Sequence, residues 1–224
     1  ATGIDFSVEM IEIAKKNSAE IGSAAQFICK SIFDLAPEPD SFEVISAQGF
    51  IEYISLEQLD QFLEFSYLAL KKGGSLALGS RNRLFNLHSL NEFTKLELQL
   101  NTIDSLLEES CILQTSATQE DAISKLAALN LSYKQPSRHP KTEIEVDTRY
   151  QFSPGDLITR LSKHGLTANR ICPVNFHALP ISLMKNEDFQ EIHKNLAQLA
   201  SENWINLQGL VPSCSSFVIE AKKA

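Results

Sequence analysis

The chain has 224 residues, of which 43% are hydrophobic, and a formal net charge of -8 at pH 7. This length and composition are typical of one globular domain, and the acidic balance argues against the phosphate backbone of nucleic acid as a main partner. No apolar run approaches the ~20 residues that span a bilayer. No secretory signal opens the chain, so we expect a cytoplasmic protein without membrane contact.

The first residues predict a strand, a tight turn and a helix. An apolar run ends at Asp5, and Ser7 then opens an amphipathic helix that we expect to run to Glu20 and to close at Gly22. An acid at the tip of a buried parallel strand can accept hydrogen bonds from both hydroxyls of a ribose, and the next apolar residue can lie against the base. Asp5 and Phe6 occupy these positions. The alternative is that Asp5 only helps to start the helix.

Strands and helices continue to alternate up to residue 80. We expect strands at 26–32, 42–48 and 75–80, and a helix at 56–72 that is capped by Ser55 and ended by Gly73 and Gly74. This alternation predicts an α/β fold with a parallel, doubly wound sheet. Such sheets bind ligands at the carboxyl ends of their strands.

The rest of the chain reads as helices followed by two more strands. Helical spacing covers 90–100, 102–109 and 118–130, and the mixed segment 131–146 is broken by prolines. Ser153 is expected to cap a helix through Lys163, with strands at 166–176 and 215–220.

Four segments carry a resemblance to a known family. They read T-G-I-D-F-S-V-E-M-I-E-I-A, S-I-F-D-L, S-F-E-V-I-S-A-Q-G-F-I-E-Y and L-K-K-G-G-S-L, all within residues 1–83. Together they resemble the class I S-adenosylmethionine-dependent methyltransferases. The resemblance implies a Rossmann-like, mostly parallel sheet whose last two strands form an antiparallel hairpin at the edge, and S-adenosylmethionine as the cofactor. It also implies these cofactor-binding residues: Asp5, Phe6, Ser31, Ile32 and Gln48. Ser31 stands where the family usually places an acid for the adenine amino group.

One departure from the family concerns its first strand and glycine-rich turn. These would precede Ala1, and none of the nine glycines forms a glycine-rich loop. We therefore expect the chain to lack both features, which would leave apolar strand edges. A second hypothesis stays open on this ground, namely a non-catalytic fragment or binding module of the same fold.

We expect a single domain over residues 1–224 with three parts. Residues 1–85 form the cofactor side, 86–150 a helical insertion, and 151–224 the C-terminal helix and edge hairpin. The insertion is too long for a simple connection. By the resemblance, it forms a lid over the acceptor.

Polar residues near strand ends are the candidates for binding the acceptor. Arg81, Asn82 and Arg83 follow one strand, and guanidinium groups bind carboxylates or phosphates in pairs. Arg149 and Tyr150, before the capped helix, are similar candidates. The alternative for the arginine pair is a solvated turn. We expect the acceptor to be a small molecule, a sugar or another polar metabolite, and the oligomeric state is not predicted.

His177 would emerge at a strand end and could serve as a general base, although a structural or surface role is the alternative. The other histidines and the four cysteines show no metal-ligand spacing, so no metal is expected, and the cysteines are expected to be buried free thiols.

Tyr67 and Lys71 have the Y-x-x-x-K spacing of short-chain dehydrogenases, which would make the chain NAD(P)-dependent. No catalytic serine strand precedes them, and their neighbours fit an ordinary amphipathic helix. This remains a minor alternative.

Overall fold

The computed structural model describes residues 1–136, 149–180, 183, 186–203 and 206–224. The first elements are β1 (Thr2–Asp5), α1 (Val8–Glu20), β2 (Gln26–Cys29), η1 (Ile32–Asp34), β3 (Phe42–Ala47), η2 (Ile51–Tyr53), α2 (Leu56–Ala69) and β4 (Leu70–Arg81). Then follow η3 (Arg83–Phe85), α3 (Asn86–Ser89), α4 (Glu92–Leu100), α5 (Ile103–Thr115) and α6 (Gln119–Leu129). The last elements are α7 (Pro154–Lys163), β5 (Leu166–Phe176), α8 (Glu187–Asn203), η5 (Leu207–Ser213) and β6 (Cys214–Lys223).

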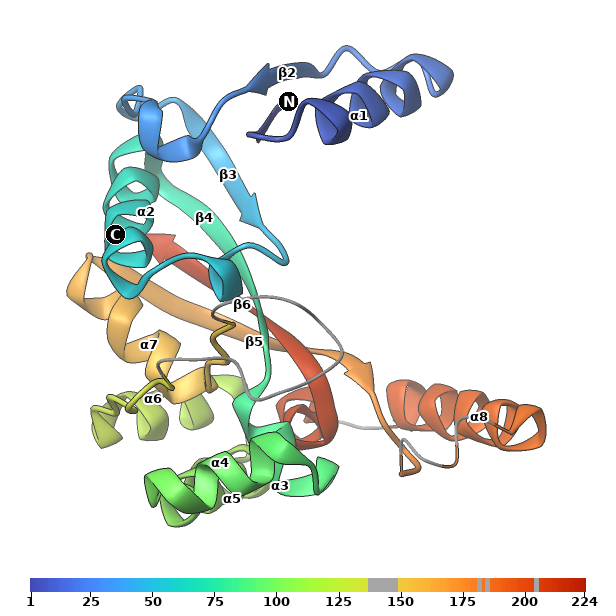
Figure 1. The fold of residues 1–224 in the computed structure, drawn as a ribbon. Helices are drawn as coiled ribbons and strands as arrows, with labels where there is room; N and C mark the ends of the chain where they lie inside the picture. The colour runs from blue at the N-terminus through green and yellow to red at the C-terminus, as the bar shows by residue number, and fades with distance from the viewer. Residues whose placement is uncertain (137–148, 181–182, 184–185, 204–205) are drawn as a thin grey trace.

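The strands form two hydrogen-bonded sheets. β1 and β2 pair in parallel, and the second sheet has the order β3-β4-β6-β5. β3 and β4 are parallel, whereas β6 runs antiparallel to both β4 and β5. The predicted α/β fold and the antiparallel pair of the last two strands, with β5 at the edge, are confirmed. Figure 1 shows the β1–α1–β2 unit lying apart from β3, on the far side of β3 from β4.

The core lies between the β3-β4-β6-β5 sheet and its helices. α2 and α7 meet at the start of β5, where His164 Nε2 lies 3.3 Å from Asp60 Oδ1 and the Tyr67 ring covers Gly165. The fully buried side chains of the sheet include Leu76, Leu78, Ile171, Phe217 and Ile219. The helices from α3 to α6 follow the end of β4 and gather at one end of the sheet (Figure 1).

Local signals placed several boundaries correctly. Ser7 caps α1 by accepting a hydrogen bond from Met10 N, and Gly22 has φ of +66° just after the helix. Ser55 and Gln58 form the capping box of α2, and Ser153 caps α7, which ends at Lys163 as predicted. β5 has the predicted bounds.

The predicted end of α2 is wrong. The helix stops at Ala69 and Leu70 already begins β4, paired with Phe42, so the strand is longer than the predicted 75–80. Leu70 fits the helical spacing of apolar residues in the sequence. In the structure it is fully buried, but as a residue of the strand β4 and not of the helix. Gly73 and Gly74 lie inside β4, where Gly73 takes a φ of +75° and a Cβ on Gly74 would meet the Lys71 and Glu43 carbonyl oxygens at 2.9 and 3.1 Å.

Three further expectations need correction. β2 ends at Cys29, because Ser31 caps the short helix η1 instead of continuing the strand. The helix α8 was not predicted. Of the four cysteines, only Cys214 is buried, while Cys29 and Cys111 are exposed, and all four are free thiols. Most of the mixed segment at 131–146 falls outside the described residues.

Candidate functional site

The carboxyl ends of the parallel strands lie at one edge in each sheet. Asp5 ends β1 and is in register with Cys29, which ends β2. Ala47 ends β3 in register with Leu78 of β4, three residues before Arg81. The candidate residues for the cofactor and the acceptor therefore follow strand ends, as expected for a doubly wound sheet.

Asp5 uses one carboxylate oxygen within the chain. Its Oδ1 accepts a hydrogen bond from Ser7 N at 2.8 Å, while Ser7 Oγ accepts one from Met10 N at 3.2 Å. Asp5 thus shapes the turn that leads into α1, in agreement with the alternative that it helps to start the helix. Within the described part of the chain its Oδ2 accepts no hydrogen bond, so this oxygen can still accept from a ligand hydroxyl.

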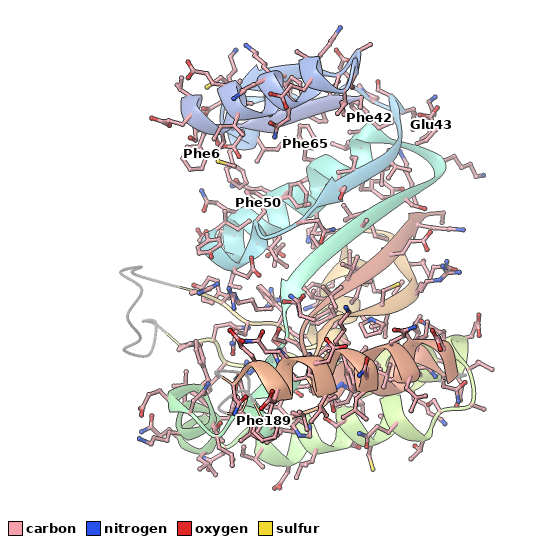
Figure 2. All side chains as sticks on the ribbon, turned by 90° about the vertical axis from the view of Figure 1, so that its right-hand side faces the viewer. Phe6, Phe42, Glu43, Phe50, Phe65 and Phe189 are labelled. Atoms are coloured by element: carbon pink, nitrogen blue, oxygen red, sulfur yellow. The ribbon has the colours of Figure 1, made fainter. Side chains whose placement is uncertain are left out.

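Phe6 and Ser31 lie next to Asp5. The Phe6 side chain is 78% exposed, and Figure 2 shows it on the lower side of the β1–α1–β2 unit, above Phe50. Ser31 follows β2, and its Oγ accepts from Phe33 N at 3.3 Å to start η1, which places Ile32 in the first position of that helix. A carboxylate with an open oxygen, an exposed ring and a neighbouring hydroxyl fit the ribose and the base of an adenosine.

Gln48 directly follows β3 and crosses to the neighbouring strand. Its Nε2 donates to Ala77 O at 3.2 Å, and its side chain lies against the backbone of Gly79. A Cβ on Gly79 would come within 1.9 Å of Gln48 Oε1, so a larger residue at this position would move the Gln48 amide from its present place. The side chain of Gln48 is exposed at this edge.

The three residues Arg81, Asn82 and Arg83 differ in their surroundings. The Arg81 side chain is exposed. Asn82 is buried, donates to Val211 O at 2.7 Å and Cys214 O at 2.9 Å, and caps η3 through Leu84 N. It therefore joins the end of β4 to η5 and β6.

Arg83 is buried in an ion pair. Its guanidinium donates to both carboxylate oxygens of Glu97 at 2.8 to 3.0 Å and lies over the Tyr133 ring, 4.7 Å from the centroid. Its Nη1 also donates to Lys134 O. Of the two arginines predicted to bind an anionic group of the acceptor, Arg83 already has a carboxylate partner inside the protein. Arg81 therefore remains the candidate.

Arg149 lies near Arg81 and beside two residues that follow β3. Its guanidinium lies over the Tyr53 ring at 5.4 Å, and the next residue, Tyr150, donates its backbone N–H to Glu52 O at 2.9 Å. Glu52 in turn accepts a hydrogen bond from Arg81 N through Oε1 at 3.0 Å. The sequence places Glu52 and Tyr53 just after a strand end, but it did not predict a role for either residue.

His177 follows the end of β5, as predicted, and its ring is packed against other rings. The ring centroid lies 4.7 Å from that of Phe85 and 6.2 Å from that of His193 on α8. Burial lowers the pKa of His177, and the nearby His193 lowers it further. Its Nδ1 is buried and has no hydrogen-bond partner in the described part of the chain.

The structure does not support the dehydrogenase alternative, because Tyr67 and Lys71 lie in different elements. Tyr67 is on α2 but Lys71 is already in β4, where it contacts Glu43, and the Tyr67 ring packs against Lys223 and Gly165. The two side chains are not presented on one helix face. Across the described residues, no cluster of three or more His, Cys, Asp or Glu could hold a metal ion, and no helix is long and apolar enough to cross a membrane.

Comparisons with known proteins bear on the family and the fold. Residues 1–74 match the family model of a methyltransferase domain. The comparison with curated proteins finds no match.

Solved structures match over nearly the whole chain. An S-adenosylmethionine-dependent methyltransferase of Methanosarcina mazei is 17% identical with a TM-score of 0.56, and the match covers 99% of this chain and 81% of that one. A putative S-adenosylmethionine-dependent methyltransferase of Listeria monocytogenes is 16% identical with a TM-score of 0.52, covering 100% and 79%. PKMT2 of Rickettsia typhi, solved in complex with S-adenosylhomocysteine, is 18% identical with a TM-score of 0.50, covering 99% and 43%.

The predicted resemblance and the predicted fold class are thus confirmed. Residues 1–74 are similar to the methyltransferase-domain family, and the chain as a whole has the Rossmann-like fold of the solved structures that it matches.

Proposed function

We propose that the protein binds S-adenosylmethionine at the ends of β1 and β2 and transfers its methyl group to a small-molecule acceptor. The observation that carries this proposal is Asp5, whose Oδ1 is held by Ser7 N while Oδ2 is open beside the exposed Phe6. This arrangement occurs within the segment that matches the methyltransferase-domain family.

In this proposal the chain holds the adenosine part of the cofactor. Asp5 accepts from the ribose hydroxyls, Phe6 and Ile32 lie against the base, and Ser31 accepts from the base edge. Gln48, held across β3 and β4, faces the cofactor from the neighbouring strand end. The cofactor itself supplies a methyl group on a sulfonium, which is already an activated leaving group. The task of these residues is therefore orientation and exclusion of water.

We place the acceptor beyond the ends of β3 and β4, and propose that it is a sugar or another small polar metabolite. Arg81, Arg149 and Tyr150 would contact the acceptor. Asn82 and Arg83 would instead stabilise the end of β4 through their buried contacts with Val211 and Glu97. The helices from α3 to α6, which follow the end of β4, would form the cover over the acceptor.

His177 is the candidate general base. The lowered pKa keeps its imidazole neutral at pH 7, which is the form that can accept a proton. If it accepts the proton of the acceptor hydroxyl or amine, His177→Gln lowers kcat by about a hundredfold or more. The same variant leaves the affinity for S-adenosylmethionine unchanged, because His177 follows β5 and not β1 or β2.

The second candidate is a binding module of the same fold without catalysis. It is favoured by the absence of hydrogen-bonded pairing between β1 and β3 in the described chain, which leaves the cofactor side of the molecule separate from the acceptor side. A module would bind a small molecule without converting S-adenosylmethionine to S-adenosylhomocysteine.

Calorimetry and product analysis separate these cases. We expect the protein to bind S-adenosylmethionine and not NADPH, and to release S-adenosylhomocysteine when a panel of small hydroxyl and amine compounds is supplied. Binding of NADPH without binding of S-adenosylmethionine would contradict the proposal. Binding of the cofactor without turnover of any acceptor would favour the module.

A further inference from the structure

Two buried charged side chains meet near the ends of β3 and β4 without pairing with each other. Glu52 on η2 is 4% exposed and Arg149 is 6% exposed. No ion pair among the described residues includes either of them. Arg149 Nε and Glu52 Oε2 are both buried, and neither has a hydrogen-bond partner among the residues that the structure describes. A charge buried in this way is unfavourable unless something pairs with it.

The guanidinium of Arg149 lies close to an aromatic ring. Its central carbon lies 5.4 Å from the centroid of the Tyr53 ring. A ring attracts a cation over its face but supplies no hydrogen-bond acceptor for the N–H donors of a guanidinium. Among the described residues, Nε has no acceptor. The side chain is thus oriented but not fully hydrogen-bonded.

The charges around Arg149 favour an added anion. Burial lowers the pKa of Arg149 and the neighbouring Arg81 lowers it further, while Tyr53 and Glu52 act in the opposite direction. Glu52 Oε1 is already occupied by the backbone N–H of Arg81. Among the described residues, the charged side chains that act on Arg149 are thus the guanidinium of Arg81 and the carboxylate of Glu52, so the three side chains together carry a positive charge.

Arg83 shows which partner a buried arginine takes in this same protein. It is 2% exposed and lies over a tyrosine ring, Tyr133, in the same way as Arg149 lies over Tyr53. Its donors are met by both oxygens of the Glu97 carboxylate. Arg149 also lies over a tyrosine ring, but no carboxylate of the described residues forms an ion pair with it.

We infer that Arg149, oriented by Tyr53 and assisted by Arg81, binds an anionic group of the acceptor, either a carboxylate or a phosphate. The inference rests on the proposed function and narrows it, since the acceptor then carries a negative charge in addition to the atom that is methylated. A guanidinium can hold either group through two parallel hydrogen bonds.

The test follows the Nε–Hε resonances of the arginines in the ¹⁵N-labelled full chain by NMR. Inorganic phosphate or sodium acetate is added while sodium chloride keeps the ionic strength constant. Arg149→Lys identifies the Arg149 signal by its loss, and the ring-current shift that Tyr53→Leu removes identifies it independently should Arg149→Lys not fold. We expect the Arg149 signal to move saturably with at least one of the two anions.

Two variants sharpen the result. Arg81→Gln should weaken the apparent affinity for the anion about threefold or more, because a neighbouring positive charge is lost. Arg170→Gln, at an exposed position on β5, is the matched control and should leave the affinity unchanged.

Each outcome decides the inference. If the Arg149 signal moves saturably with phosphate alone, the anionic group of the acceptor is a phosphate. If it moves with acetate alone, the group is a carboxylate. Movement with both anions supports a site that accepts either group. No saturable movement, or equal movement of the Arg170 signal, overturns it. Calorimetry with S-adenosylmethionine on the same sample tests the proposed function separately. A failure of anion binding at Arg149 can therefore be distinguished from a failure of cofactor binding.

Discussion

The β1–α1–β2 unit and the β3-β4-β6-β5 sheet use their apolar residues in different ways. In the unit, α1 buries Ile11 but exposes Val8, Met10 and Ile13, and Ile21, directly after the helix, is exposed as well. In the sheet, the inward side chains of β4, β5 and β6 are fully buried against helices. The residues proposed to bind the cofactor belong mostly to the first region, while the stability of the protein lies mainly in the second. A substitution should therefore affect binding or folding according to the region in which it lies.

The largest expected effect on stability comes from breaking the buried ion pair behind β4. Arg83→Met removes the cationic partner of the buried Glu97 carboxylate. It should lower the free energy of unfolding by about 3–5 kcal/mol. Chemical denaturation measures this. The matched control is Lys95→Met, which breaks an exposed pair with Glu92 and should change the free energy by no more than ~0.5 kcal/mol. Equal effects of the two variants would contradict the account.

A core truncation should separate the two regions directly. Leu76 of β4 is 0% exposed, and Leu76→Ala should cost about 2–5 kcal/mol of stability through lost contacts and a cavity. Met10 of α1 is 53% exposed, and Met10→Ala should change stability by less than ~0.5 kcal/mol. If Met10→Ala were as destabilising as Leu76→Ala, the apolar face of α1 would be buried in solution.

The pH dependence of stability should report on Glu109 of α5. Burial raises the pKa of Glu109 to about 7, although Tyr133 Oη and Gly155 N both donate hydrogen bonds to its carboxyl group. In the folded chain this group keeps a proton that the unfolded chain has already lost, so its contribution to stability is fully present below pH ~4.5 and is lost as the pH rises through about 7.

Glu109→Gln removes this titration. The amide oxygen can accept from Gly155 N while the amide nitrogen donates to Tyr133 Oη. Thermal unfolding of both proteins should be measured at a series of pH values. Between pH ~4.5 and ~7 the wild type should lose stability relative to the variant. A difference that does not change with pH would mean that Glu109 is ionised throughout.

The comparison also shows what could be predicted from the sequence. The caps at Ser7, Ser55 and Ser153 and the bounds of β5 depend on local chemistry, and the structure has them as predicted. The end of α2 did not follow from local chemistry, because Leu70 is buried by pairing with Phe42, which a helical spacing cannot distinguish from burial on a helix.

The site was predicted less well for a related reason. Arg81 and Arg83 look alike in the sequence, and only the fold shows that Glu97 on α4 pairs with Arg83 and leaves Arg81 exposed. Similarly, nothing local to Arg149 indicates that the Tyr53 ring lies under it, since almost a hundred residues separate the two (53 to 149). Partners that are distant in the chain decide which polar residues are available for a ligand.

At Asp5 we expect a small effect on stability together with a large effect on binding. Asp5→Ala removes the acceptor for Ser7 N and should cost about 1 kcal/mol of stability, as the loss of a helix-start contact does. Asp5→Asn keeps an acceptor for Ser7 N through its amide oxygen, so its thermal midpoint should match that of the wild type. The pair of variants separates the role of Asp5 in the turn from its proposed role in binding.

Calorimetric titration of S-adenosylmethionine into wild type, Asp5→Ala and Asp5→Asn tests the central claim most directly, with Glu12→Ala on the exposed side of α1 as the control. We predict that Asp5→Ala weakens binding at least ~30-fold, because hydrogen bonds to a carboxylate contribute about 1.5–3 kcal/mol each, and that Asp5→Asn also weakens it. Glu12→Ala should bind as the wild type does. An unchanged affinity in both Asp5 variants would contradict the claim and leave Asp5 with its role in the turn alone.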